Sequence, residues 1–377
     1  MNDINSTRSI SAIVYLAVIG PCVFILQPGF VQGLVAYLGM TEEQAGLIAS
    51  YEMFGIAGTT VLMSLLASRL NWRGVLRACL ALCVVGNLAS IGQHDFATLG
   101  VLRFLTGLGS GGLVSLTFTM MGLTARPDRN FGYIVVWVLT YGAFGLLAMP
   151  WAFATIGMSG VLVFFALFCA TGFLFVGPLP ASSNSTAAAA AQASSFPIST
   201  RLSALAGVLV YNTAVGVVWA YLFLVGLEAG MGEQEVANAL TFSQFLGIAG
   251  AFLPVVLELR YGRAAPLAVG VLGGAASIYL LLGEVGATGY WLAVGGFNLL
   301  WNLCVPYLLA MMAAFDARGR LVVHGVSMQF VGYAVGPFIA ASLLGVGGYD
   351  LVNGVSVALF LLSAVLLAPG LLVQRRG

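Results

Sequence analysis

The strongest constraint in this sequence is a series of long apolar segments that recurs from one end of the chain to the other, with short polar connections between them. Most are close to the roughly 20 residues that a helix needs to cross the hydrocarbon core of a bilayer. Charged residues occupy only 7% of the 377 positions, whereas soluble domains carry about 25%. The sequence therefore predicts an all-α integral membrane protein surrounded by a lipid bilayer.

Dividing the apolar segments at charges and turn residues predicts twelve transmembrane helices. They cover residues 11–38, 42–67, 74–92, 97–123, 131–155, 157–178, 202–228, 233–257, 264–283, 286–314, 321–345 and 349–373. Thr41 and Gln44 suit a capping box that starts the second helix, whereas we expect His94 and Asp95 to be solvated residues of an outer loop.

The chain also divides into two similar halves. Residues 181–200 are poor in large apolar side chains and predict a flexible cytoplasmic linker. We expect residues 1–180 and 201–377 to form an N-terminal and a C-terminal six-helix bundle. Pairs at a constant spacing of 191 residues indicate two parallel repeats: Gly39 with Gly230, Met40 with Met231, Arg69 with Arg260, Met120 with Met311 and Gly145 with Gly336.

The arginines predict the orientation in the membrane. The 14 positive charges are all arginine, and all but Arg103 fall at one side of the predicted helices. The positive-inside rule places that side in the cytoplasm. We therefore expect a multi-pass protein of the cell inner membrane with both termini in the cytoplasm.

Three local patterns resemble the major facilitator superfamily. The loop after the second helix carries Arg69 and Arg73 as in the superfamily's G-x-x-x-D-R-x-G-R-R, although Ser64, Ser68 and Asn71 replace its Gly, Asp and Gly. The fourth helix matches R-x-x-Q-G-x-G from Arg103 onward, with Thr106 in place of Gln. The fifth helix resembles the antiporter signature only in part, because Leu146 stands where that signature has proline.

This resemblance implies a secondary transporter whose two halves rock about a site between them. It also implies that the arginines of the cytoplasmic loops, Arg69, Arg73, Arg260 and Arg263, form a cytoplasmic gate. Candidate acidic partners for that gate are Asp128, Glu258 and Asp316.

Glu52 and Arg103 are the charges predicted to lie at membrane depth, where a charged residue costs roughly 2.5–3.5 kcal/mol on insertion scales. We expect them to face one cavity from the second and fourth helices and to act in proton coupling. Burial favours the protonated form of a carboxyl and a nearby arginine favours the ionised form, so conformation can switch such a group. Two alternatives stay open: a permanent ion pair that joins the helices, and an Arg103 that binds a substrate carboxylate.

The other polar side chains are unevenly distributed. The helices predicted at 74–92, 157–178, 264–283 and 349–373 are nearly all apolar, and we expect the second of these to face lipid. The alternative role for the polar residues elsewhere is hydrogen bonding or packing between helices. The residues expected to bind substrate in a central cavity are Gln27, Trp137, Tyr141, Asn212, Trp219, Gln244, Asn298, Asn302, Gln329 and Tyr333.

These features predict a proton-coupled transporter of a small organic solute, anionic, aromatic or amphiphilic, that functions as a monomer. A drug or metabolite efflux antiporter of the same fold is the alternative, and a non-transporting membrane protein is the rival class. Gly107, Gly109 and Gly112 match a dinucleotide fingerprint, but they lie inside an apolar helix, where small residues serve helix packing. We expect no enzymatic activity, no cofactor, no metal and no nucleic-acid partner.

Overall fold

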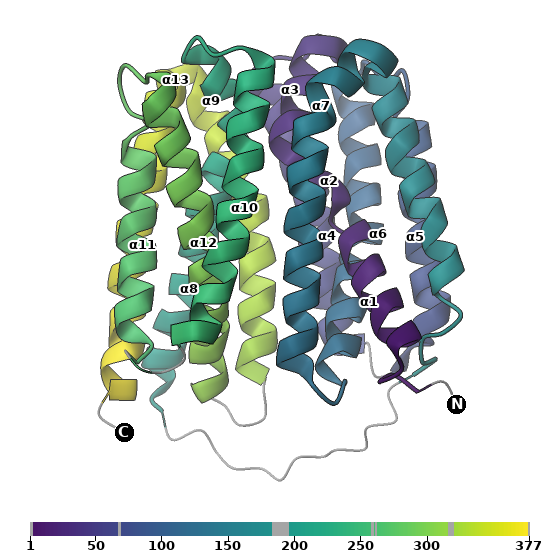
Figure 1. The fold of residues 1–377 in the computed structure, drawn as a ribbon, viewed down its shortest axis with the longest axis vertical. Helices are drawn as coiled ribbons and strands as arrows, with labels where there is room; N and C mark the ends of the chain where they lie inside the picture. Colours follow the sequence, from purple (N-terminus) through teal and green to yellow (C-terminus); the bar gives the residue numbers. More distant parts are fainter. Residues whose placement is uncertain are drawn as a thin grey trace. The chain divides into compact units, whose positions relative to one another are not determined.

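The computed structural model of the chain describes residues 3–66, 69–182, 196–257, 260, 262–315 and 320–375. Within these residues the secondary structure is helical, without strands, which confirms the predicted all-α fold. A helix suits a bilayer because it satisfies its own backbone hydrogen bonds. The chain divides into two compact units, residues 1–186 and 187–377, and each is a bundle of long helices lying side by side (Figure 1).

The first unit begins with an interrupted helix. Its pieces α1, α2 and α3 are separated at Gly20–Pro21 and at Leu26. Pro21 has no N–H to donate to the helical ladder, and Pro28 lies in the first turn of α3, where a missing N–H is tolerated. The elements of this unit are α1 (Thr7–Ile19), α2 (Cys22–Ile25), α3 (Gln27–Leu38), α4 (Glu42–Leu66), α5 (Trp72–Ala89), α6 (Phe96–Gly122), α7 (Pro127–Thr171) and the 3₁₀ turn η2 (Gly172–Phe175).

The second unit has the same kind of organisation. Its first helix is interrupted at Ala220–Tyr221, between α8 and α9. Its elements are α8 (Ile198–Trp219), α9 (Leu222–Glu228), α10 (Glu233–Leu257), α11 (Ala264–Tyr279), α12 (Ala287–Phe315) and α13 (Arg320–Arg375).

Two helices are far longer than one membrane crossing needs. Helices α7 and α13 comprise 45 and 56 residues, against roughly 20 for a crossing. Each contains a break, at Gly157 (φ 64°) in α7 and at Gly348 (φ 61°) in α13. Glycine adopts this left-handed backbone without the steric penalty of a Cβ. Both breaks fall where the sequence predicts one transmembrane helix to end and the next to begin.

Among the described residues, eight helices are long and apolar enough to cross a membrane, and α7 and α13 account for two of them. Twelve crossings are compatible with this structure if α7 and α13 each count as two crossings, on either side of their glycine breaks, and if the interrupted α1–α3 and the shorter α11 each count as one. The number of crossings stays a prediction.

Corresponding helices make corresponding contacts in the two units. Helix α6 packs against α4 and α5, and α12 packs against α10 and α11. A matching detail is a thiol that faces a glycine: Cys79 of α5 lies against Gly112 of α6, and Cys304 of α12 lies against Gly270 of α11. Positions 79 and 270 differ by 191 and positions 112 and 304 by 192, so to within one residue of the repeat the thiol and the glycine have exchanged helices.

The expectation that the segment 157–178 faces lipid is wrong for half of its surface. Leu162 and Phe165 are 1% and 0% exposed, whereas Phe164 and Leu167 are 49% and 62% exposed. The buried face packs inside the first unit, where the ring of Phe165 contacts the ring of Phe30. Uniform hydrophobicity hides this difference, because a lipid-facing side and a protein-facing side use the same apolar residues.

Two helix starts are fixed by side chains. Thr41 and Gln44 form the predicted capping box, with Gln44 N–H donating to Oγ1 of Thr41 and Thr41 N–H donating to Oε1 of Gln44. Asp95, expected to be merely solvated, is the N-cap of α6. Its Oδ2 accepts from the backbone N–H and the hydroxyl of Thr98, each at 2.8 Å, and these bonds lower the pKa of its carboxyl.

Candidate functional site

Three helices of the first unit approach closely because α6 carries glycines on two faces. A Cβ on Gly107 or Gly111 would overlap the carbonyl oxygen of Glu52 or Ile56 in α4. On the other face, a Cβ on Gly109 would lie 2.7 Å from the carbonyl oxygen of Cys79 in α5. Small residues that let helix backbones approach are typical of membrane interiors. This packing, not nucleotide binding, accounts for the glycine pattern.

This packing brings Glu52 and Arg103 together inside the first unit. Nη1 of Arg103 lies 3.8 Å from Oε2 of Glu52, and the exposed fractions of the two side chains are 0% and 5%. The separation suits an ion pair but exceeds the length of a direct hydrogen bond. The two residues are adjacent, as expected, while their role in proton coupling stays a prediction.

Neutral side chains supply the hydrogen bonds of Arg103. Oδ1 of Asn87 in α5 accepts from both Nη1 and Nη2 at 3.0 Å, and Oγ1 of Thr106 accepts from Nη2 at 2.9 Å. The guanidinium carbon also lies 5.8 Å from the ring centre of Phe30 in α3. Asn87 was not among the predicted site residues, because its helix reads as nearly all apolar. Its signal in the sequence is a lone amide in an apolar helix. Asn87 lies near the C-terminal end of α5, and Arg103 lies near the N-terminal end of α6, which follows it.

The equivalent interface of the second unit carries amides in place of charges. Gln244 of α10 is 2% exposed, and the spacing of 192 that relates Gly55–Ile56–Ala57–Gly58 to Gly247–Ile248–Ala249–Gly250 also relates it to Glu52. The neighbouring Ser243 accepts a hydrogen bond of 3.1 Å from Nδ2 of Asn298 in α12. Asn302 donates to the backbone and side-chain oxygens of Asn298, at 2.9 and 2.8 Å. The predicted residues Asn298 and Asn302 are therefore brought together in a neutral network that joins α12 to α10 through Ser243.

A second predicted group meets around the hydroxyl of Tyr333 in α13. That oxygen accepts from Nε1 of Trp301 at 3.0 Å and from Nε2 of Gln329 at 2.9 Å. Trp219 of α8 packs edge-on against Trp301, with ring centres 5.5 Å apart. Three helices of the second unit thus contribute to one aromatic cluster with amide and hydroxyl groups at its edge.

Two predicted amides have an oxygen without a hydrogen-bond partner among the described residues. Nδ2 of Asn212 donates to the carbonyl of Val208 at 2.7 Å, but its Oδ1 is buried and unpaired. Asn212 and Gln329 line one narrow gap between α8, α12 and α13. In the first unit, Oε1 of Gln27 is likewise buried and unpaired.

Trp137 and Tyr141, two predicted substrate-binding residues four positions apart in α7, do not present one common face. Trp137 is 58% exposed, whereas the ring of Tyr141 stacks on Phe168 with centres 5.3 Å apart. The hydroxyl of Tyr141 is buried without a partner among the described residues. Residues four apart in a helix share a face only approximately, and the neighbouring segment covers Tyr141 but not Trp137.

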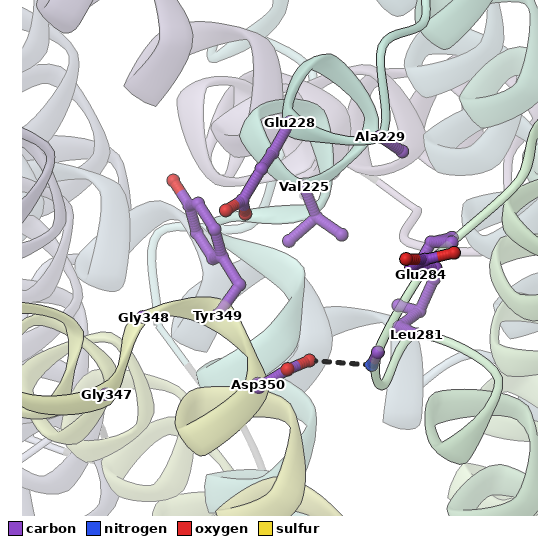
Figure 2. A pocket seen from close by; sticks show the side chains of 11 residues that line it. Val225, Glu228, Ala229, Leu281, Glu284, Gly347, Gly348, Tyr349 and Asp350 are labelled. Carbon is purple, nitrogen blue, oxygen red and sulfur yellow. Dashed lines mark hydrogen bonds between the residues drawn. The ribbon is translucent and has the colours of Figure 1, made fainter.

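A separate pocket of about 410 Å³ lies at one end of the second unit, where the ends of α9 and α11 meet the break in α13. Three carboxylates line it, from Glu228, Glu284 and Asp350 (Figure 2). Oδ1 of Asp350 accepts from the backbone N–H of Gly283 at 2.8 Å. None of the residues predicted to bind substrate lines this pocket.

The sequence model of the Major Facilitator Superfamily matches residues 13–315. The chain belongs to this superfamily. Its fold is similar to that of a mutant of the nucleoside transporter NupG, with a TM-score of 0.72 and 12% sequence identity over 96% of this chain and 99% of that chain. It is also similar to the human organic anion transporter MFSD10, with a TM-score of 0.70 and 16% identity over the same shares of the two chains. No curated protein matches in sequence.

Membership of the superfamily makes this chain a multi-pass membrane transporter. The two solved structures support the fold alone, because their sequence identity is low. Among the described residues, no group of three or more His, Cys, Asp or Glu side chains is positioned to hold a metal ion.

The loop between α4 and α5, which matches the superfamily's loop pattern, has a local structural role. Nε of Arg73 donates to the carbonyl of Leu179 at 2.5 Å, and the backbone N–H of Trp72 donates to the backbone carbonyl of Ala181 at 2.8 Å. Asn71, where the superfamily has glycine, caps α5 by accepting from the N–H of Gly74. The loop before α5 is thereby tied to the segment that follows η2.

The remaining arginines of the predicted gate lie at helix ends or in turns. Arg69 and Arg260 are exposed and Arg263 is half-buried. Glu258, Asp316 and the side chain of Asp128, the acids expected to pair with the gate, lie outside the described residues. The gate function of Arg69, Arg73, Arg260 and Arg263 therefore stays a prediction.

Proposed function

We propose that the protein is a secondary active transporter that couples the movement of a small organic solute to protons by alternating access. The observation that carries this proposal is the buried pair of Glu52 and Arg103, 3.8 Å apart inside the first unit. A carboxyl at membrane depth raises the free energy of membrane insertion, and ionisable residues found there usually have a functional role.

The geometry of the pair favours proton exchange over a purely structural ion pair. A structural pair that offsets its desolvation needs close, well-formed hydrogen bonds between the charges. Here the hydrogen bonds of Arg103 go to Asn87 and Thr106, while Glu52 stands 3.8 Å away. Glu52 can therefore gain or lose a proton without dismantling the hydrogen bonds that hold the arginine.

The second unit supports a substrate with apolar or aromatic character. Trp219, Trp301 and Tyr333 offer aromatic surface, and Gln329 and Asn212 offer amide groups beside it. This cluster contains no charged member. Nucleosides and organic anions, carried by the two transporters of similar fold, are two classes that combine planar rings with hydrogen-bonding groups. Arg103 permits an anionic substrate as well.

We propose the cell inner membrane as the location, with both termini in the cytoplasm, from the one-sided distribution of arginine. Uptake and export both fit the coupled mechanism. In an efflux antiporter the proton moves in the direction opposite to the solute, whereas in proton-coupled uptake both move in the same direction.

The test uses purified protein in liposomes that contain a pH-sensitive dye, with an imposed pH gradient. A panel of nucleosides, aromatic organic acids and amphiphilic drugs is added outside, and internal pH is recorded. We expect at least one compound to change the rate of proton movement in vesicles with the protein and not in empty vesicles. Solute accumulation that is identical with and without a pH gradient would contradict proton coupling.

A further inference from the structure

Asn87 holds an unusual position in the first unit, because one neutral oxygen serves both terminal nitrogens of a buried arginine. Oδ1 accepts from Nη1 and Nη2 of Arg103, both at 3.0 Å, and Asn87 is 1% exposed. Charge-assisted hydrogen bonds of this kind are among the stronger ones in proteins. The guanidinium of Arg103 is therefore hydrogen-bonded to a neutral amide, although a carboxylate lies nearby.

The orientation of both neutral acceptors is fixed by second hydrogen bonds. Nδ2 of Asn87 donates to the carbonyl of Cys83, one turn earlier in α5, at 2.9 Å. The hydroxyl of Thr106 donates to the carbonyl of Leu102 at 2.7 Å. The amide nitrogen and the hydroxyl hydrogen are thus turned away, and each residue presents only lone pairs to Arg103. The arrangement suits a cation and would not suit a neutral side chain at this position.

Close packing places Asn87 within reach. A Cβ on Gly86 would overlap Oγ1 of Thr106, so only glycine beside Asn87 allows α5 to approach α6 so closely. The two acceptors of Arg103 therefore come from the closely packed helices α5 and α6, and neither comes from α4, which carries Glu52.

The second unit lacks the whole set. At the repeat spacing of 191, Asn87 corresponds to Ile278, Arg103 to Val294 and Thr106 to Phe297, and all three are at most 1% exposed. Gly270 lies 191 positions after Cys79, and Cys304 lies 192 positions after Gly112, so the register of these helices holds to within one residue. At either spacing an uncharged residue, Val294 or Gly295, stands in place of Arg103, and Ile278 or Tyr279 stands in place of Asn87.

We infer that Asn87, together with Thr106, is a positioning residue that holds Arg103 in one place whether Glu52 is ionised or protonated, so that Glu52 is the member of the pair that changes state. This inference rests on the proposed function and specifies how its site operates. Without Asn87, the nearest alternative for the guanidinium is a direct bond to Glu52, which would favour ionised Glu52. With an aspartate at position 87, a second carboxylate would compete for Arg103 and repel Glu52, which would favour protonated Glu52.

Other groups around the pair do not carry this behaviour. Facing it are Phe30 from α3, Cys83 from α5 and Cys169 from α7. Phenylalanine does not titrate. A thiol ordinarily titrates at about pH 8.5, well above the ordinary titration range of a carboxyl.

The test measures protonation of Glu52 directly and needs no substrate. Purified full-length protein is treated with dicyclohexylcarbodiimide, which reacts with protonated carboxyls in apolar surroundings, over a series of pH values. Mass spectrometry then gives the modified fraction of Glu52, with Glu52→Gln as the blank. We expect Asn87→Leu to move the midpoint of labelling to lower pH and Asn87→Asp to move it to higher pH. Each shift should be about one pH unit, a tenfold change in the ratio of the two forms.

Asn353 provides the matched control. It is an asparagine of α13 in the second unit, 1% exposed, whose Nδ2 donates to the carbonyl of Leu281. Asn353→Leu and Asn353→Asp should leave the midpoint of Glu52 unchanged. If Asn87→Leu does not fold, Thr106→Val removes the other neutral acceptor at nearly equal volume and should shift the midpoint in the same direction.

Midpoints that move in one direction in both Asn87 variants, or do not move, would overturn the inference and leave Asn87 a packing residue. A wild-type Glu52 that is labelled equally at every pH would instead count against its role as the coupling acid, and so against the proposed function. The two failures are therefore distinguishable.

Discussion

At the scale of single residues, the interior of the first unit depends on positions where no side chain fits. Gly107 of α6 touches the backbone of α4 at Glu52, and Gly55 of α4 touches the backbone of α6 at Phe104. These contacts set the spacing of the two helices, and the spacing sets the distance between Glu52 and Arg103. Substitution of either glycine therefore affects both stability and the site.

Gly107→Ala should destabilise the protein, because its Cβ would overlap the carbonyl oxygen of Glu52, a backbone atom that moves only with its helix. Overpacking of this kind costs roughly 1–3 kcal/mol. Gly58→Ala is the control, since that glycine lies in α4 with open space around its Cα. Thermal unfolding in detergent should show a lower melting temperature for Gly107→Ala alone, and equal melting temperatures would contradict the packing account.

How far single residues could be predicted depends on the signal each one carries. Glu52 and Arg103 are conspicuous because charge at membrane depth is rare, and they prove to be adjacent. Asn87 carries a weaker signal, a lone amide in an apolar helix, and its role becomes visible only when Arg103 is seen beside it. Trp137 and Tyr141 are equally aromatic, yet only the fold decides that one is exposed and the other covered.

At the scale of helices, boundaries follow from local chemistry. The predicted segments 42–67 and 97–123 closely match α4 (Glu42–Leu66) and α6 (Phe96–Gly122), since caps and charges mark their ends. The interruptions inside the first helix of each unit were not predicted. They lie within continuous apolar sequence, where only proline and packing indicate a break.

Asp95 should support α6 in a pH-dependent manner. Its pKa is lowered by the hydrogen bonds from Thr98, so its contribution to stability is present above the unfolded pKa of about 3.9 and is lost as pH falls through the folded pKa. Asp95→Ala should therefore melt below wild type at neutral pH, with the difference shrinking in acid. Asp95→Asn, which keeps a capping oxygen, should lose less. A difference that grows in acid would contradict this assignment.

The glycine break of α7 should tolerate substitution poorly. Gly157 has φ 64° and ψ −177°, a region that is essentially restricted to glycine and costs other residues of order 1–3 kcal/mol. Gly157→Ala should lower the melting temperature, whereas Gly132→Ala in the same helix, with open space and no positive φ, should not. Equal effects of the two substitutions would show that the break does not require glycine.

At the scale of the whole molecule, the sequence repeat and the superfamily match agree on a transporter built from two related units. The units differ in chemistry: the first carries the buried acid and arginine, and the second carries aromatic rings and amides. This division is consistent with coupling in one unit and solute recognition in the other. Sequence predicts the repeat because spacing is preserved, but it does not predict the solute, because neutral polar groups are used equally for packing and for binding.

If Glu52 carries the coupled proton, its replacement by glutamine should uncouple transport in liposomes, measured with a solute identified by the screen. Glutamine keeps the size of the side chain and removes its titration. We expect that Glu52→Gln still exchanges labelled solute across the membrane without a gradient, while accumulation driven by a pH gradient is lost. Accumulation in Glu52→Gln that still follows the pH gradient at the wild-type level would contradict this expectation.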